Sequence, residues 1–291
     1  MMVVKPSIGE RIFNVFNIIF MAFMICIALY PFWYCVTCSF SKDIVGNTAS
    51  LMLWPKTFSV AAYAKVLSDP LILTGYKVTI FVVVVATVLN LIMTIIAAFL
   101  LTRREFAIRN GLTWMMLITM YFGGGMIPTY IVYTQILGLE NSLLALILPG
   151  MISVYNMIVM RTNFNGIPRS LEESVKVDGG NDMHVLWHII IPLSKAVISV
   201  IVLYYGVGHW NAWFNALLYI KDRDKIPLQL ALRSILIQEQ VNTGEGAVDS
   251  MGMAENIKFA TIIVATVPIL LVYPFIQKYF VKGVMIGAVK G

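Results

Sequence analysis

Long apolar runs separated by shorter polar segments dominate the hydropathy pattern of this chain. A helix needs about 20 apolar residues to cross a membrane, and each run is long enough. The first run, from Ile12 to Ser41, holds no charged residue. The pattern predicts an all-α integral membrane protein with transmembrane helices over residues 12–38, 76–101, 112–136, 142–161, 196–219 and 257–280.

Composition supports a multi-pass membrane protein. Of 291 residues, 59% are hydrophobic and 12% are charged, and the mean hydropathy is +0.83. Soluble domains carry about 25% charged residues, so a large soluble core is excluded. A cleaved signal peptide would have a shorter apolar region than the first run. We expect one transmembrane domain over residues 1–291.

Charge sets the expected orientation. Six spans place both termini on one side, and cytoplasmic segments are enriched in lysine and arginine. The whole net charge of +6 falls on the segments that this topology places inside. Both termini and the loop 162–195 are therefore expected in the cytoplasm, with external loops at 39–75 and 220–256. No basic run is interleaved with aromatic residues, so nothing indicates nucleic-acid binding.

The polar loop after the fourth run predicts a helix, a glycine turn and a second helix. Ser170 and Glu173 have the spacing of a capping box, which predicts a helix start. Gly179-Gly180 would close that helix, Asn181 would cap the next, and Pro192 would break or kink it. Such a knob suits a partner protein, and an ordinary amphipathic connector is the alternative.

The spacing of this loop resembles a family signature. Glu173-Ser174-Val175 is followed after three residues by Gly179 and after nine more by Ile189, just before Ile191-Pro192. This resembles the Glu-Ala-Ala loop of ABC importer permeases, with Ser174 and Val175 in place of the alanines and Ile191 in place of a leucine. The resemblance implies a coupling helix that docks into a cleft of an ATPase subunit. The coupling residues it implies are Glu172, Glu173, Asp178, Gly179, Ile189 and Pro192.

Two further segments narrow the resemblance. The run 122–130, FGGGMIPTY, is similar to carbohydrate permeases for oligosaccharides and polysaccharide fragments. Its glycines should interrupt the third span, facing either the translocation pathway or a closely packed helix. The small, basic tail 282–291 resembles that of the maltose-type inner permease, which reaches the ATPase interface. The tail residues implied in that contact are Gly287, Lys290 and Gly291.

The resemblance implies the type I permease fold of ABC importers. It also implies a second, homologous permease, two ATPase subunits that bind ATP and magnesium, and an extracytoplasmic solute-binding protein. The expected location is the bacterial cytoplasmic membrane, in contact with lipid. No cofactor is expected in this chain.

The fifth run carries aromatic and polar side chains that suit a sugar pathway: Tyr204, Tyr205, His209, Trp210 and Asn211. Polar groups inside a span are costly and usually face a cavity or a partner helix. Aromatic faces and amides can stack on sugar rings and bind hydroxyls. An interfacial aromatic belt is the alternative. In maltose-type importers, moreover, the partner permease holds most sugar contacts.

The second external loop contains a flexible run after an amphipathic stretch. The corresponding loop of maltose-type importers enters the cleft of the binding protein. That resemblance implies contacts through Asn242, Gly244 and Gly246, and a solvated loop is the alternative.

Other chemistry is weakly indicated. The sequence has no Gly-Lys pair and so no Walker A loop, which makes the chain a transport subunit rather than an enzyme. His184 and His188 are four residues apart, but Val185 breaks the zinc-protease pattern, and we expect no metal. Cys35 and Cys38 form a CxxC pair, which we interpret as incidental, lipid-facing or packed thiols; a redox or disulfide role is the alternative.

The function that the resemblance implies is that of a permease subunit of an ATP-driven ABC importer for oligosaccharides, coupled to the ATPase subunits through residues 168–192. No acidic residue lies inside the predicted spans, which argues against a proton- or sodium-coupled secondary transporter. That alternative, and an ABC permease for another polar solute such as an amino acid, remain open at this stage.

Overall fold

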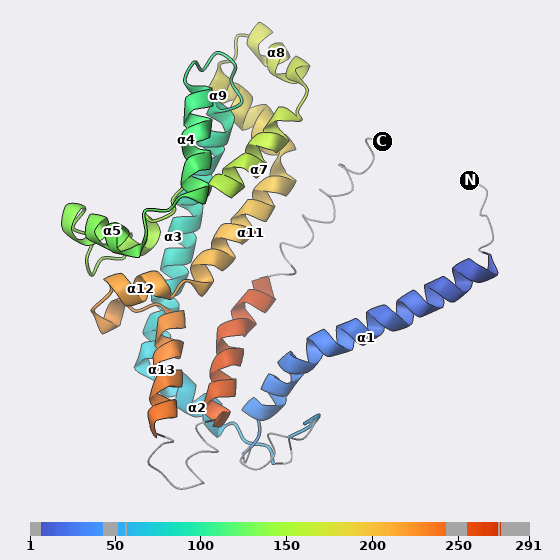
Figure 1. The fold of residues 1–291 in the computed structure, drawn as a ribbon, viewed down its shortest axis with the longest axis vertical. Helices are drawn as coiled ribbons and strands as arrows, with labels where there is room; N and C mark the ends of the chain where they lie inside the picture. Colours follow the sequence, from blue (N-terminus) through green and yellow to red (C-terminus); the bar gives the residue numbers. More distant parts are fainter. Residues whose placement is uncertain (1–6, 43–51, 56, 243–254, 273, 275–291) are drawn as a thin grey trace. The chain divides into compact units, whose positions relative to one another are not determined.

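The computed structural model describes residues 7–42, 52–55, 57–242, 255–272 and 274, with no side-chain description for 238–242 (Figure 1). These residues are largely helical, and among them the β pairing is a single isolated bridge between Ser41 and Phe58. The chain divides into two compact units, Met1–Asp69 with Ser234–Thr266, and Pro70–Arg233 with Val267–Gly291.

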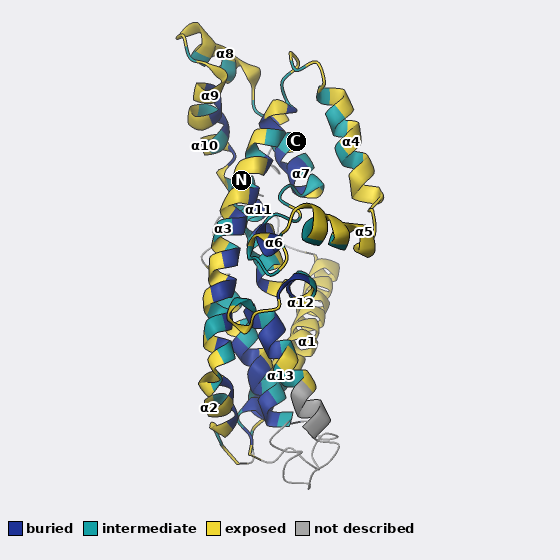
Figure 2. Cartoon of the chain, turned by 90° about the vertical axis from the view of Figure 1, so that its left-hand side faces the viewer, coloured by how far each residue is buried: buried dark blue, intermediate teal, exposed yellow. Residues whose placement is uncertain are grey.

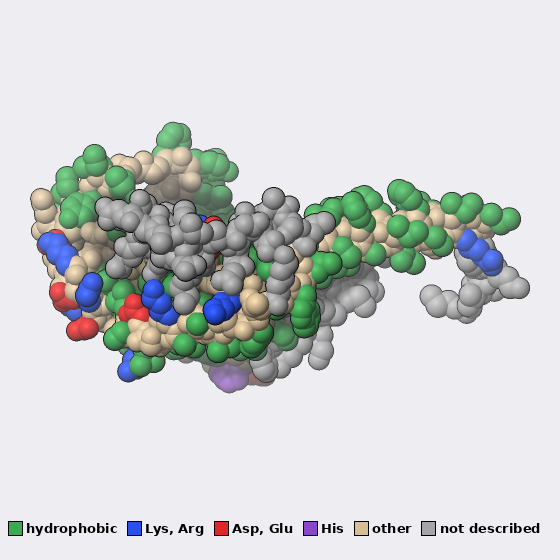
Figure 3. Space-filling model, turned by 90° about the horizontal axis from the view of Figure 1, so that it is seen from below, with side chains coloured by type: hydrophobic (Ala, Val, Ile, Leu, Met, Phe, Trp, Pro, Cys, Tyr) green, Lys and Arg blue, Asp and Glu red, His purple; other side chains and the backbone are tan. Residues whose placement is uncertain are grey.

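The first unit is built on α1, Ile8–Ser39, and the short α2, Ala61–Ser68. A capping box between Ser7 and Glu10 starts α1. Most of α1 is exposed and carries hydrophobic side chains (Figures 2 and 3). Its one basic residue, Arg11, lies near its start. A helix that is apolar all round and unburied is suited to lipid or to another membrane helix.

The second unit is organised around α3, Pro70–Leu100, which packs against α11, Lys195–Asn211, and α7, Val154–Asn165 (Figure 1). Ala98, Met157 and Ile201, one from each helix, are fully buried in their common core. The buried polar residues of α3 lie on a single face: Thr79, Thr87, Asn90 and Thr94.

The third apolar run is broken at its glycines, as predicted. Helix α4, Arg109–Tyr121, ends before them, and α5, Met126–Ile131, continues into η1, Val132–Ile136, after a bend of 114°. Gly125 lies in the positive-φ region at 86°, which disfavours residues with a Cβ and explains a glycine there.

The fourth and fifth runs are also divided. Helix α6, Leu144–Ile147, is separated from α7 by a segment in which Gly150 has φ +70°. Helix α11 ends at Asn211, and α12, Phe214–Tyr219, follows with Trp213 as its N-cap. Irregular backbone inside a membrane needs protein or water to satisfy its polar groups.

The chain then forms η3, Arg223–Lys225, and α13, Leu228–Asn242. The start of α13 lies against α3, where the backbone N–H of Leu228 donates to Thr79 Oγ1 over 2.8 Å. A Cβ on Gly75 would lie 3.0 Å from the Cα of Leu228, so glycine allows the two backbones to approach this closely.

Among the described residues, three helices are long and apolar enough to cross a membrane: α1, α3 and the helix Glu255–Val272. Two bent pairs add candidate broken spans, α4 with α5–η1, and the helical segment Asp182–Leu193 with α11. The multi-pass, all-helical class is therefore confirmed.

Candidate functional sites

The predicted knob is a hairpin of two helices, here called the coupling hairpin, residues 168–193. Its first arm is α8, Arg169–Val177, which ends in a Schellman motif. The backbone N–H of Gly180 donates to the carbonyl of Val175, and that of Gly179 donates to the carbonyl of Lys176. Gly179 has φ +82°, so the predicted closure of the helix by glycine is confirmed.

The predicted capping box is wrong. Helix α8 begins at Arg169 with Pro168 as its N-cap, and no side chain caps it. The proline ring holds φ at −59°, which suits a helix start without a cap from Ser170.

The second arm begins where expected. Asn181 Oδ1 accepts the N–H of His184 over 2.9 Å and starts α9, Asp182–Val185. The arm continues through η2, Leu186–Ile190, a π-helix, into α10, Ile191–Leu193. Pro192 does not end it; the 83° bend into α11 follows at Ser194.

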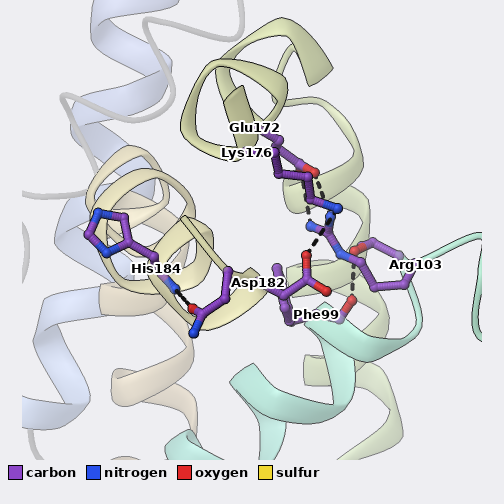
Figure 4. A network of polar contacts seen from close by, with 8 residues as sticks. Phe99, Arg103, Glu172, Lys176, Asp182 and His184 are labelled. Carbon is purple, nitrogen blue, oxygen red and sulfur yellow. Dashed lines mark hydrogen bonds and ion pairs between the residues drawn. The ribbon is translucent and has the colours of Figure 1, made fainter. Parts of the chain in front are cut away.

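One ion pair ties α8 to the segment after α3. Both guanidinium nitrogens Nη1 and Nη2 of Arg103 donate to the carboxylate of Glu172, over 2.5 and 3.1 Å (Figure 4). The two side chains are only 14% and 15% exposed. The guanidinium also lies over the Phe99 ring, 4.1 Å from its centre. This pair was not predicted, because the sequence separates its members by an entire pair of spans.

The other predicted coupling residues do not share that position. Glu173, Asp178, Gly179 and Pro192 are exposed, whereas Ile189 is half-buried. Glu172 is the one that contacts Arg103.

Beside the ion pair lies a polar hollow of about 430 Å³, lined by side chains of both signs. Glu105 is one of the lining residues, and its own backbone N–H, with the charges of Lys176 and Arg103, lowers the pKa of that carboxyl.

The residues predicted for the pathway separate into packed and open groups. Tyr205 is buried, and its hydroxyl accepts the N–H of Ser153 over 2.9 Å and shares a 2.7 Å hydrogen bond with Thr94 Oγ1. His209 Nε2 lies 3.0 Å from Asn90 Nδ2. These bonds join α3, α11 and the start of α7.

The open group surrounds a hollow of about 530 Å³, here called the α11 hollow. Tyr204 and Asn211 are exposed on one face of α11, and Tyr155 of α7 lies 6.4 Å from Tyr204 between ring centres. Trp210 is buried and does not line it. The lining carries hydroxyl, amide and aromatic groups without a charge: Ser153, Tyr155, Asn156, Tyr204, Tyr205, Val207, Gly208 and Asn211.

A polar cluster follows α12. Asn141 adopts φ +56°, and its Oδ1 accepts the N–H groups of Lys221 and Asp222 over 3.1 and 3.0 Å. Its backbone carbonyl accepts Lys225 Nζ over 2.9 Å. Hydrogen bonds from Asn141 and Lys225 lower the pKa of Asp222, and the bond to Glu140 raises the pKa of Lys221. Sequence reasoning missed this cluster.

Several predicted residues cannot be placed. Gly244, Gly246, Gly287, Lys290 and Gly291 lie outside the described residues. Asn242 ends α13, with no description of its side chain.

Metal binding has no support in the part of the chain that is described. No group of three or more histidine, cysteine or acidic side chains gathers there. His184 and His188 stack with ring centres 4.0 Å apart. The three cysteines are free thiols.

A helical, multi-pass membrane protein with broken spans and an exposed polar hairpin has the features of a transport component. Residues 59–286 match the family of binding-protein-dependent transport system inner membrane components, and the chain belongs to that family. It is thus a multi-pass membrane permease component and not an enzyme.

The relatives agree with this family. The chain is 44% identical to the protein LplC of Bacillus subtilis, over 97% of this chain and 96% of LplC. It is 40% identical to the polygalacturonan/rhamnogalacturonan transport system permease protein YtcP of the same organism, over 97% of this chain and 99% of YtcP. A bacterial ABC transporter involved in the import of the acidic polysaccharide alginate contains a chain of similar structure, with a TM-score of 0.84 and 31% sequence identity. The match covers 96% of this chain and 100% of the transporter chain.

Proposed function

We propose that this chain is the permease subunit of an ATP-driven ABC importer for oligosaccharides. The family and the ABC-transporter chain of like fold support the import mechanism. The proposal includes six spans with both termini in the cytoplasm, a second homologous permease, two ATPase subunits that bind ATP and magnesium, and an extracytoplasmic binding protein.

The observation that carries the coupling role is the Schellman turn at the tip of the coupling hairpin. It closes α8 with Glu173, Val177 and Asp178 exposed, and Val177 is 87% exposed. An apolar side chain between two carboxylates at an exposed tip suits insertion into a cleft with apolar and basic walls. We infer that this tip binds an ATPase subunit and that Glu173 pairs with one of its cations.

Co-purification tests the coupling role. The tagged chain, expressed with its genomic neighbours and extracted in mild detergent, should retain ATPase subunits. Glu173→Arg reverses an exposed charge without touching the core, and we expect it to lower retention. Asp224→Arg reverses an exposed charge away from the hairpin and is the matched control. Failure of the native chain to retain any ATPase would contradict the proposal.

The substrate class is inferred from relatives and from the α11 hollow. One relative is named for polygalacturonan and rhamnogalacturonan, and the transporter of like fold for alginate. The uncharged hollow can stack sugar rings on Tyr155 and Tyr204 and bind hydroxyls through Asn211. It offers no cation to a uronate, so an acidic sugar would find its positive partner elsewhere in the complex.

Uptake measurements test the substrate class. Tyr204→Ala and Asn211→Ala should lower uptake of short oligogalacturonides by cells or proteoliposomes, while ATPase retention stays intact. Leu67→Ala removes an exposed apolar side chain of α2 and serves as control. An importer that takes up an amino acid and no oligosaccharide would overturn this assignment.

A further inference from the structure

The ion pair between Arg103 and Glu172 has no role in the coupling function as described so far. We propose that it is the link that transmits movement of α8 to α3, and through α3 to the α11 hollow; this rests on the proposed function. Arg103 and Glu172 would be positioning residues, acting through helices and not by contact with ATP or sugar.

The hairpin needs such a link because few side chains of α8 reach the rest of the protein. No residue of α8 is buried, and only Glu172 and Val175 are half-buried. Contacts of side chains must then carry the movement, and Lys176 with Asp182, 3.2 Å apart, only joins the two arms of the hairpin.

The ion pair has the geometry of a stiff contact. A guanidinium that meets a carboxylate through two parallel hydrogen bonds is fixed in direction as well as distance. Low exposure limits screening by salt. The guanidinium also packs on the Phe99 ring, which further restricts its motion. Figure 4 shows Glu172 of α8 pointing at Arg103, which follows the end of α3.

Arg103 is itself firmly attached to α3. Its backbone N–H donates to the carbonyl of Leu100, and its own carbonyl accepts Arg109 Nη1 at the start of α4. A pull on the side chain therefore reaches the last turn of α3.

The same helix carries the contacts to the pathway. Thr94 bonds the hydroxyl of Tyr205, and Asn90 bonds His209. Asn90 lies about 14 Å along α3 from Phe99 at 1.5 Å per residue. A helix packed on both α11 and α7 moves as a rigid body over that length. One element thus connects Glu172 to two residues of α11 that flank the hollow.

The experiment uses the intact complex with ATPase subunits and needs no identified sugar. The three native cysteines are replaced by alanine, and Asn211→Cys reports on the α11 hollow through its rate of reaction with an impermeant maleimide. With the native Arg103–Glu172 pair, we expect a non-hydrolysable ATP analogue to change this maleimide reaction rate about tenfold. With Arg103→Ala or Glu172→Ala, we expect the analogue to change the rate about twofold or less.

The charge exchange Arg103→Glu with Glu172→Arg separates transmission from mere folding. It should restore most of the nucleotide-dependent change that the single variants lose, and Arg103→Lys should give an intermediate change. Arg104→Ala removes the same charge from the next, exposed residue, which lines the same polar hollow, and should behave as the native chain.

Two results would overturn the inference. The first is that both single variants show the same nucleotide-dependent change in labelling rate as the native pair. The second is that the double variant loses this change as fully as the single variants do, although its ATPase subunits remain bound and ATP binding is unchanged. If the native pair itself retains no ATPase, the proposed function has failed. If ATPase is retained and Arg103→Ala responds normally, only the inference has failed.

Discussion

Substitution of Gly179 offers a quantitative test of the coupling hairpin. Its φ of +82° costs a residue with a Cβ about 1–2 kcal/mol, and nothing lies within 4 Å of the position that a Cβ would take. Because no other part of the chain packs against this position, we expect Gly179→Ala to relax the turn and leave the bundle intact. The ratio of hairpins in the docking conformation to relaxed hairpins then falls by a factor of about 5–30, and the apparent ATPase affinity falls by up to that factor.

Two companions make the result specific. Asparagine tolerates positive φ better than alanine, so Gly179→Asn should lose much less affinity although its side chain is larger. Gly180→Ala should be more damaging than Gly179→Ala, since its Cβ would lie 2.5 Å from Val175 Cγ1 and 2.9 Å from the Val175 carbonyl oxygen. Valine in a helix has one favoured rotamer and cannot turn aside. Adding Val175→Ala should recover part of the loss.

The assay is a titration of the detergent-extracted chain with labelled ATPase subunit, with thermal unfolding of the chain alone as the check on folding. The reasoning is refuted if Gly179→Asn binds as weakly as Gly179→Ala. Glycine would then be needed for space at the partner surface, and the backbone conformation would not be the cause.

Three other outcomes are expected. Tyr205→Phe leaves Ser153 N–H and Thr94 unpaired and should cost about 1–3 kcal/mol of stability in detergent unfolding, whereas Tyr204→Phe, with an exposed ring, should cost almost nothing. Asn141→Ala loses both side-chain hydrogen bonds and strains φ, so amide exchange at Lys221 and Asp222 should accelerate; Asn141→Gly should show the loss of the bonds without the strain. The pKa of Asp222 is lowered from its ordinary value of 3.8 in the folded protein. The ionised carboxylate therefore stabilises this cluster above pH 3.8, and the stabilisation is lost as the pH falls through the lowered pKa of the folded protein. Amide exchange of residues 220–226, corrected for intrinsic rates, should therefore rise at acid pH, and Asp222→Asn should abolish that rise.

The hairpin was largely readable from sequence because its signals are local. A positive-φ turn needs glycine, and Asn181 caps a helix that starts one residue later, so each feature is specified within a few residues. The same holds for the break at the glycine run in the third apolar segment. The one local error, the capping box, arose because Pro168 already begins the helix without help from Ser170.

The pathway contacts were not readable because they join distant segments. Trp210 and Asn211 were equally good sugar ligands by residue type, yet Trp210 is buried away from the hollow and Asn211 lines it. Burial depends on which face of α11 meets α3 and α7, and a run that is apolar on every side does not reveal its orientation.

A signal for that orientation does exist, and it lies on α3. Polar side chains inside a span are costly unless they face protein, so their positions mark the buried face. Thr79, Thr87, Asn90 and Thr94 are spaced by eight, three and four residues and share one face of a helix, and all are buried. From the sequence alone, these four polar positions would have identified α3 as the central helix and predicted partners for Asn90 and Thr94 on other spans. They also explain why one helix can join the coupling hairpin to the hollow: the residues that fix α3 against its neighbours are the ones that would convey its movement to them.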